Sequence, residues 1–228
     1  LLGFEATSLK LVRRLAADNG HEVPREFDHA LEAALEFSLH VHQPNGLVPS
    51  LSDGDVRSFL PLLAQGAALF DRGDMQYVAT AGAQGTPPRE RNAHFPNSGY
   101  HVLRSDWASV DAQHLVFDCG PLGEGNHGHF DALSFELAAH GRALVVDPGR
   151  YTYSEATTAD DPRNWRLHFR GTAAHNTVCV DGRNQTRYEP KPVKEASRHA
   201  PGSVRHKIAG PGPDTTLLEA RCGDSLDL

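Results

Sequence analysis

The fold is best judged from residues 125–147, which read GNHGHFDALSFELAAHGRALVVD. In the middle of this stretch apolar and polar residues alternate with a period of two, which predicts a half-buried β-strand. The apolar members are Leu133, Phe135 and Leu137, and the polar members are Ser134 and Glu136. His140-Gly141 then supplies a tight turn, and the apolar run that ends at Asp147 predicts a returning strand. The stretch therefore predicts an antiparallel hairpin.

The rest of the chain divides into a helical part and a strand-rich part. Apolar residues within 4–83 recur three or four apart, which predicts two antiparallel helices that meet between Gly20 and Pro24, and a third helix over 57–70. Further strands are predicted at residues 99–105, 114–118, 127–140, 142–147, 176–181, 203–209 and 216–222. We therefore expect helices over 1–83, a Gly- and Pro-rich linker over 84–96, and an antiparallel β-sandwich over 97–228.

Composition excludes several classes of function. The 228 residues include 39% hydrophobic and 22% charged residues, a balance typical of a globular protein. Because 29 acidic residues outnumber 22 basic ones, the net charge of -7 disfavours nucleic acid as a partner. No run approaches the roughly 20 apolar residues that a membrane span needs.

Candidate chemistry concentrates where the predicted strands begin or end. On an extended strand His127, His129 and Asp131 would share one face, and such a group favours a metal or catalytic site over a solvated polar surface. Downstream, Asp147 ends one apolar run and His175 precedes another. Taken singly, Asp147 fits an ordinary turn and His175 a structural histidine, but His129, Asp147 and His175 together make a ligand set that suits Zn²⁺.

Several motifs, in their order and spacing, resemble the heparinase II/III-like polysaccharide lyases. They are Phe95-Pro96-Asn97-Ser98-Gly99-Tyr100, residues 125–135, residues 147–151, Arg170-Gly171-Thr172-Ala173-Ala174-His175-Asn176-Thr177 and Asp181-Gly182. The likeness is strong over 92–188, and residues 1–83 look like the last helices of that family's incomplete (α/α) toroid. The resemblance implies an α+β multidomain fold, a toroid followed by an antiparallel β-sandwich, of which this chain is a fragment truncated at both ends.

The resemblance also implies roles for matching positions. His129, Asp147 and His175 would hold a zinc ion, and His127 would be the catalytic histidine. For the substrate we expect contacts from Arg170, which lies in the matching motif, and from Tyr151 and Trp165. The implied substrate is an anionic uronate polysaccharide, a glycosaminoglycan or alginate. A periplasmic or secreted location is implied as well, while a homodimer is left open.

β-Elimination explains why such residues are needed. The reaction removes a weakly acidic proton from C5 of a uronic acid and releases the group on C4, so it requires a base, a neutralised carboxylate and a proton donor. An imidazole, whose pKa is about 6.5, serves as a base near neutral pH. The resemblance implies that a toroid tyrosine and a carboxylate-neutralising residue come from a part of the toroid that this fragment lacks. Tyr151 and Tyr153 are not assigned to that role.

Two other readings stay open. His129, Asp131 and His175 also form the HxD…H pattern of Fe(II)/2-oxoglutarate oxygenases, in which Asp131 is a ligand and Arg183 binds the oxoglutarate. Alternatively, the chain is a non-catalytic, zinc-stabilised sandwich that binds carbohydrate. The acidic run at residues 52–55 lacks the downstream Glu of a calcium loop and is interpreted as a loop and helix N-cap.

Overall fold

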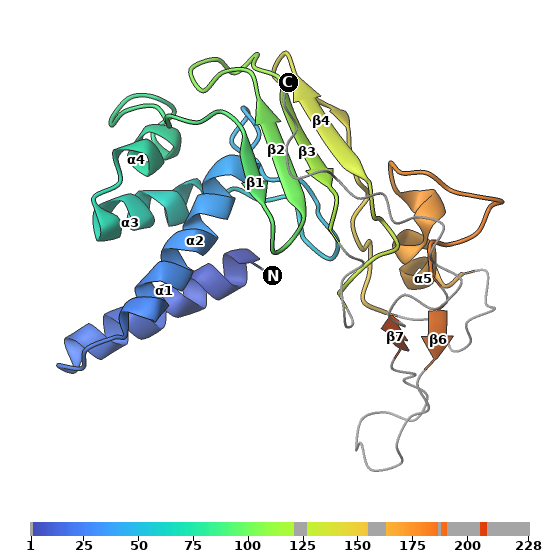
Figure 1. Ribbon diagram of the computed structural model, residues 1–228, viewed down its shortest axis with the longest axis horizontal. Helices are drawn as coiled ribbons and strands as arrows, with labels where there is room; N and C mark the ends of the chain where they lie inside the picture. The colour runs from blue at the N-terminus through green and yellow to red at the C-terminus, as the bar shows by residue number, and fades with distance from the viewer. Residues whose placement is uncertain (1, 121–126, 155–162, 187, 191–205, 209–228) are drawn as a thin grey trace, which may run out of the picture.

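The computed structural model describes residues 2–120, 127–154, 163–186, 188–190 and 206–208. Four helices come first: α1 (Leu2–Asp18), α2 (Arg25–Val41), α3 (Leu60–Phe70) and α4 (Gly73–Ala79). The strands that follow are β1 (Ala93–Phe95), β2 (Tyr100–Arg104), β3 (His114–Asp118), β4 (Phe135–Ala139) and β5 (Arg142–Val145). After them come α5 (Trp165–Arg170), the 3₁₀ turn η1 (Thr172–Ala174), β6 (Tyr188–Pro190) and β7 (His206–Ile208). Figure 1 shows the first four helices at one end, the sheet in the middle, and α5, β6 and β7 at the other end.

The helical part has its own apolar core around one face of α2. Leucines recur every four residues along α2, so they share a face and pack against α3 and α4. The buried members of this core are Leu31, Leu35, Leu39, Leu62, Leu63, Ala67 and Met75. At Gly66 of α3 an added Cβ would lie 2.7 Å from Cδ1 of Leu35. Glycine therefore permits the close approach of α2 and α3.

A second core joins the end of α2 to the sheet. Phe37 and Val41 of α2, with Val48 of the next loop, pack against Val102 of β2 and Val116 of β3. The Phe37 ring also makes edge-on contacts with Phe95 and Tyr100, with centroids 5.0 and 5.6 Å away. Because α2 contributes to both cores, it fixes the sheet against the helices.

The sheet is antiparallel, and its strands follow in the order β1-β2-β3-β4-β5. Ala139 pairs with Arg142 across the β4–β5 turn, where His140 and Gly141 have φ values of 52° and 69°. Two successive residues with positive φ are the signature of a type I′ hairpin turn. The predicted turn and the helix-then-antiparallel-sheet arrangement are thus confirmed.

Some predicted strand boundaries are wrong. The strand expected over 127–140 is present only as β4, because Leu133 has a φ of 64° and interrupts the extended backbone. Residues 176–181 contain turns and bends instead of a strand. β1 lies inside the predicted linker 84–96, so pairing with the sheet begins earlier than expected.

The helix predictions need smaller changes. The third helix begins at Leu60 rather than at residue 57, and the short helices α4 and α5 were not predicted. Of the strand expected over 203–209, the described part is β7. The strand expected over 216–222 lies outside the described residues.

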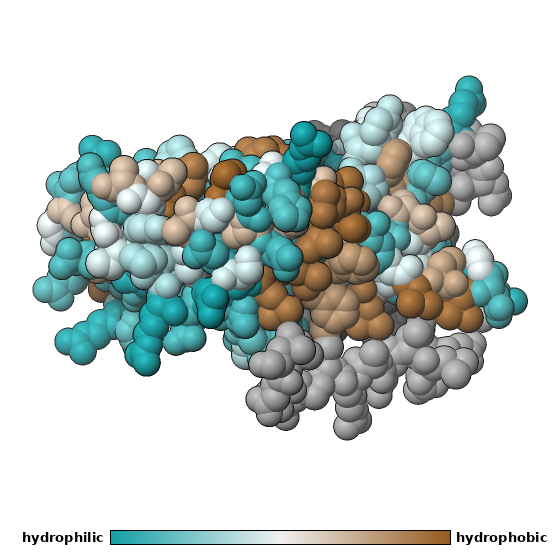
Figure 2. Space-filling view, turned by 90° about the horizontal axis from the view of Figure 1, so that it is seen from above, coloured by the Kyte–Doolittle hydropathy of each residue, from teal (hydrophilic) through white to brown (hydrophobic). Residues whose placement is uncertain are grey.

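Apolar surface is concentrated on the sheet part of the molecule. Leu144 and Val146, at β5, and Val178 and Val180 are each more than half exposed. Figure 2 shows apolar side chains gathered over the middle of the molecule, while the helical end is largely hydrophilic. Among the helices of the described ranges, none is long and apolar enough to cross a bilayer.

The His42 side chain links α2 to α3 and makes this junction sensitive to acid. Its Nδ1 donates to the Ser38 carbonyl at 2.8 Å, and its Nε2 accepts the Phe59 amide hydrogen at 2.9 Å. Nε2 can accept this bond only while the ring is neutral. Burial, helped by the charge of Arg104, lowers the pKa of His42 from 6.5 to about 4.

We expect His42 to lower the free energy of unfolding as the pH falls from about 6.5 to about 4. In this window the unfolded chain binds the proton first, so acid favours unfolding, by up to about 3 kcal/mol for one such group. Urea unfolding at pH 7 and pH 4.5 measures the effect. On going from pH 7 to pH 4.5, His42→Gln should lose less free energy of unfolding than the original chain, whereas His21→Gln, at an exposed position, should respond to pH as the original chain does. An undiminished difference in His42→Gln contradicts the assignment.

Candidate functional site

Asp53 is the centre of the candidate site. It lies in the loop after Val48, and its side chain is 3% exposed. Its Oδ2 accepts hydrogen bonds from His127 Nδ1 and Arg166 Nη2, both at 2.8 Å. Its Oδ1 accepts from His129 Nε2 at 2.9 Å and from Arg166 Nη1. The Asp53 carboxylate thus joins a loop of the helical part to α5 and to the segment that contains His127 and His129, which we call the histidine segment.

The charge of Asp53 determines how both histidines are held. Burial alone would raise the pKa of Asp53, but hydrogen bonds from His129 and Arg166, with the charge of Arg166 and a bond from His127, hold it well below its usual range. An ionised carboxylate only accepts hydrogen bonds, so each histidine nitrogen that faces it carries a hydrogen. In a neutral ring the other nitrogen then presents a lone pair. That nitrogen is Nε2 in His127 and Nδ1 in His129.

Three buried imidazole nitrogens have no hydrogen-bond partner within the described residues, and two of them, His129 Nδ1 and His175 Nε2, belong to this site; the third is His40 Nδ1. The rings of His129 and His175 lie close together, with centroids 5.1 Å apart. His175 is held through its other nitrogen, since Nδ1 lies 2.6 Å from Asp147 Oδ2. Burial lowers the pKa of His175, but the bond to Asp147 and the charges of Asp147 and Asp131 outweigh it, so the pKa is raised. A metal ion would satisfy both free nitrogens.

The structure brings two of the three predicted metal ligands, His129 and His175, together with Asp131 rather than with Asp147. His129, Asp131 and His175 offer ligand atoms that lie within 4.8 Å of one another, and all three residues are buried. Asp147 instead contacts the ring of His175, the position of a carboxylate that orients a histidine ligand. That Asp147 is itself a ligand stays a prediction. Two imidazoles and one carboxylate fit a zinc site in either case.

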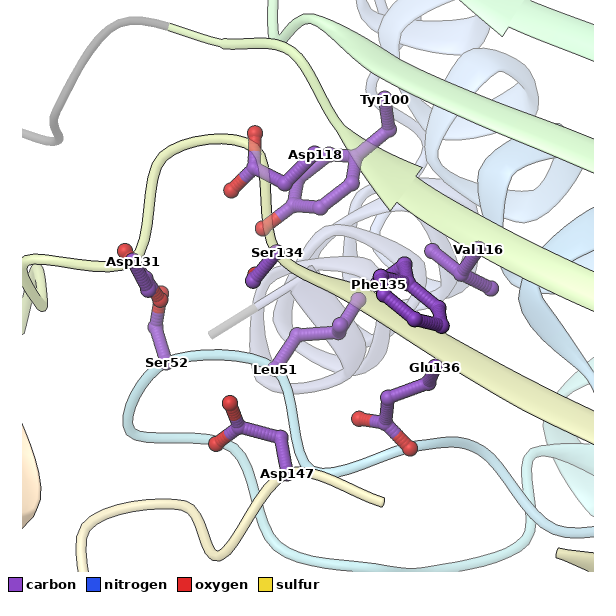
Figure 3. A pocket seen from close by; sticks show the side chains of 10 residues that line it. All are labelled: Leu51, Ser52, Tyr100, Val116, Asp118, Asp131, Ser134, Phe135, Glu136 and Asp147. Carbon is purple, nitrogen blue, oxygen red and sulfur yellow. The ribbon is translucent and has the colours of Figure 1, made fainter. Parts of the chain in front are cut away.

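A small acidic pocket adjoins these residues. Figure 3 shows carboxylates from β3, β4 and nearby loops around it: Asp118, Asp131, Glu136 and Asp147. Burial, together with the charge of Asp147, raises the pKa of Glu136 to about 8. Burial, together with the charge of Asp131, raises that of Asp118 to about 7. The crowding of acidic groups in this pocket favours a cation beside Asp131 and Asp147.

Arg170 lies in the interior rather than on a substrate-facing surface. It is 1% exposed, and its Nε and Nη2 donate to the Gly128 carbonyl at 3.2 and 3.1 Å. The predicted contact between Arg170 and substrate is therefore corrected: this side chain fixes the backbone between His127 and His129. Its place in the matching motif reflects that structural task.

Tyr151 and Trp165 do lie on the surface, with ring centroids 6.3 Å apart. They are 68% and 47% exposed, and Phe169 stacks on Tyr151 with centroids 5.0 Å apart. Tyr153, 57% exposed, is nearer to the catalytic candidate, since its ring centroid lies 6.2 Å from that of His127. We call Tyr151, Tyr153, Trp165 and Phe169 the aromatic patch.

Asp53 was missed as a site residue. The acidic run was interpreted as an N-cap, but the N-cap of α3 is Phe59, and Asp53 faces the histidines instead. No local pattern marks this, because Asp53 lies 74 and 76 residues before its histidine partners. The sequence also does not show that Arg166 is the basic residue that pairs with Asp53, because this pairing depends on tertiary structure.

The Asp53 loop is itself packed against the turn that follows Asp147. Gly149 has a φ of 63°, and a Cβ there would lie 2.2 Å from Ser50 Oγ. Ser50 Oγ in turn donates to the Gly54 carbonyl at 2.7 Å. Next to this contact, Arg150 Nη1 donates to the Asp53 carbonyl at 2.9 Å and pairs with Asp55. The two loops therefore hold each other in place.

Comparison with known proteins gives a consistent result. Residues 64–218 match the family model described as heparinase II/III-like, C-terminal. The heparin-sulfate lyase of Bacteroides stercoris is 30% identical over 168 residues, 72% of this chain and 24% of that protein. That of Bacteroides thetaiotaomicron is 28% identical over 203 residues, 79% of this chain and 28% of that protein. The chain thus spans about a quarter of the length of these relatives.

Solved structures agree with these relatives. A heparinase III gene product superposes with a TM-score of 0.70 at 28% identity and covers 78% of this chain and 28% of its own. Another heparinase III has a TM-score of 0.67 at 26% identity, over 81% of this chain and 31% of its own. These similarities confirm the predicted fold class, the end of an (α/α) toroid followed by an antiparallel β-sandwich.

We expect Asp53→Asn to lower the free energy of unfolding by about 3 kcal/mol or more, because the variant breaks the buried ion pair with Arg166. Denaturant unfolding near pH 7 measures this. Asp55→Asn is the matched control, since the Asp55 side chain is 55% exposed and such pairs contribute at most about 1 kcal/mol. Equal losses in both variants refute a special role for Asp53.

Proposed function

Because the chain belongs to the heparinase II/III-like family, we propose that the protein is a polysaccharide lyase that cleaves a uronate-containing glycosaminoglycan of the heparan sulfate type by β-elimination. The relatives named heparin-sulfate lyases support this substrate class over alginate. A periplasmic or secreted location, where such polymers are met, belongs to the same proposal.

The observation that carries the proposal is the placement of His127. Its Nδ1 is held by Asp53, and its side chain remains 48% exposed, so Nε2 is the nitrogen available to a ligand. An anchored neutral imidazole with an accessible lone pair is suited to remove a proton. The ionised Asp53 also stabilises the imidazolium that forms once the proton has been taken.

Although the sequence does not assign Tyr153 to proton transfer, its ring contacts that of His127, and we therefore propose Tyr153 as the proton donor. In the proposed step the C5 proton moves to His127 Nε2, the electron pair forms the C4–C5 double bond, and the C4–O4 bond breaks. The departing O4 takes a proton from the Tyr153 hydroxyl. The guanidinium carbons of Arg150 and Arg166 lie 4.3 and 5.4 Å from the centroid of the Tyr153 ring. Both cations therefore lie beside the ring of the proposed proton donor.

The aromatic patch supplies a surface for the sugar chain. Tyr151 and Trp165 are exposed, and their ring centroids lie 6.3 Å apart. Tyr151 also has a φ of 58°, an uncommon backbone conformation for a residue of this size. Such strain is typical of functional segments, and it supports a role for Tyr151 in contacting substrate.

We propose that zinc is held by His129 Nδ1, by His175 and by a carboxylate, with Asp147 as the residue that the family resemblance implies. Bound zinc would cross-link the histidine segment, the turn after β5 and the segment after η1, which is a structural task beside His127. The grouping of His129, Asp131 and His175 also satisfies the iron alternative. The family match favours the lyase, since an oxygenase leaves the helical part unexplained.

Metal analysis distinguishes these alternatives. We expect about one zinc ion per purified chain, lost in His129→Ala and in His175→Ala and retained in the control His94→Ala. Asp147→Asn should weaken zinc binding by about 10- to 100-fold, the usual effect of altering a carboxylate ligand or its partner. Asp131→Asn should weaken it less. Bound iron that depends on Asp131 and not on Asp147 supports the oxygenase instead.

Activity of the full-length protein tests the lyase proposal directly. Heparan sulfate should give the ultraviolet absorbance of an unsaturated uronate, and alginate should not. His127→Ala and Tyr153→Phe should each lower kcat by about 10²-fold or more, because each removes a proton-transfer group. Tyr151→Phe keeps the ring and is the matched control, with kcat nearly unchanged. If heparan sulfate, chondroitin, hyaluronan and alginate all stay intact, the non-catalytic carbohydrate-binding alternative is favoured.

A further inference from the structure

A second cavity, of about 240 Å³, lies between the helical part and the sheet. It shares no lining residue with the Asp53 cluster. Its walls come from four places: the loop after α2, the start of α3, the end of α4 with the residues that follow, and the end of β2 with its following loop. None of the lining residues is Asp or Glu, so the cavity lacks the acidic character of the pocket in Figure 3.

The cation of this cavity is Arg104, the last residue of β2. It is 7% exposed, and Nη2 donates to the His42 carbonyl. Its Nε is buried without a hydrogen-bond partner in the described ranges. The guanidinium lies over the ring of Trp107, with its carbon 4.1 Å from the centroid. In the described part of the chain, Arg104 thus forms no ion pair with a carboxylate.

Asp106 acts on Arg104 through its charge, but the two residues form no ion pair in the described part of the chain. Burial lowers the pKa of Arg104 to about 10, which leaves it a cation at neutral pH. His42 and His114 adjoin it, and the charge of Arg104 helps burial to lower their pKa values to about 4 and about 3. A buried charge with a single carbonyl and an aromatic face as partners is costly to maintain. A bound anion would offset that cost.

We propose that this cavity binds the carboxylate or sulfate group of a small anionic molecule no larger than one sugar unit. The Arg104 guanidinium provides the positive charge that either group would need. Trp107 and Tyr77 would provide flat surfaces for the body of the ligand. The cavity lies below the roughly 300–1,000 Å³ usual for larger ligands, so it suits a ligand of one sugar unit. The inference stands apart from the lyase proposal, because it uses none of the same residues.

The test is titration of the 228-residue chain with glucuronate, with N-sulfoglucosamine and with uncharged glucose, followed by protein NMR or calorimetry. We expect saturable binding of at least one of the two anions and none of glucose. Binding of glucuronate alone assigns a carboxylate, and binding of N-sulfoglucosamine alone assigns a sulfate. Arg104→Met should weaken the binding at least ten-fold. Arg89→Met, which removes an arginine whose side chain is 95% exposed, should leave it unchanged.

A second variant keeps the proposal open to refutation if Arg104→Met does not fold. Ala108 lies at the exposed rim of the cavity, so Ala108→Trp should obstruct ligand entry without changing charge. Far-ultraviolet circular dichroism checks that each variant is folded. The proposal is overturned if neither anion binds saturably, or if Ala108→Trp and every folded Arg104 variant bind as well as the original chain.

Discussion

The hydrogen bonds to the Asp53 carboxylate determine the rest of the site. Without them His127 would have no fixed ring orientation, His129 would have no reason to present Nδ1, and α5 would lose its anchor through Arg166. Asp53 comes from the helical part, while its partners follow the third strand or belong to α5. The site therefore exists only where the helices and the sheet meet.

That junction is held by α2, which contributes to both apolar cores. Its leucine face packs against α3 and α4, while Phe37 and Val41 reach the sheet. The same junction carries the buried polar groups His42, Arg104 and His114, which a purely apolar interface would lack. Apolar packing therefore provides the adhesion between the two parts, and the directional bonds of these polar groups define their relative position.

The sequence is informative where local pattern determines structure. Glycine and proline mark the ends of α1 and α2, and His140-Gly141 identifies the β4–β5 turn. The sequence also indicates the candidate zinc ligands, because histidines and carboxylates cluster near the ends of the predicted strands. The role of Asp53 and the burial of Arg170 cannot be predicted from local sequence, because each depends on contacts between residues more than 40 positions apart. Irregular backbone at residues 127–134 likewise follows from such contacts and not from an alternating pattern.

The contact between Gly149 and Ser50 constrains how such proteins can be recombined. A side chain at position 149 would overlap Ser50, and Ser50 in turn supports the loop that presents Asp53. The turn after β5 and the loop after α2 thus depend on each other for their conformation, although 99 positions separate Ser50 from Gly149. In a chimera that joins the helices of one relative to the sheet of another, Asp53 would hold His127 and His129 in place only if both loops came from the same parent.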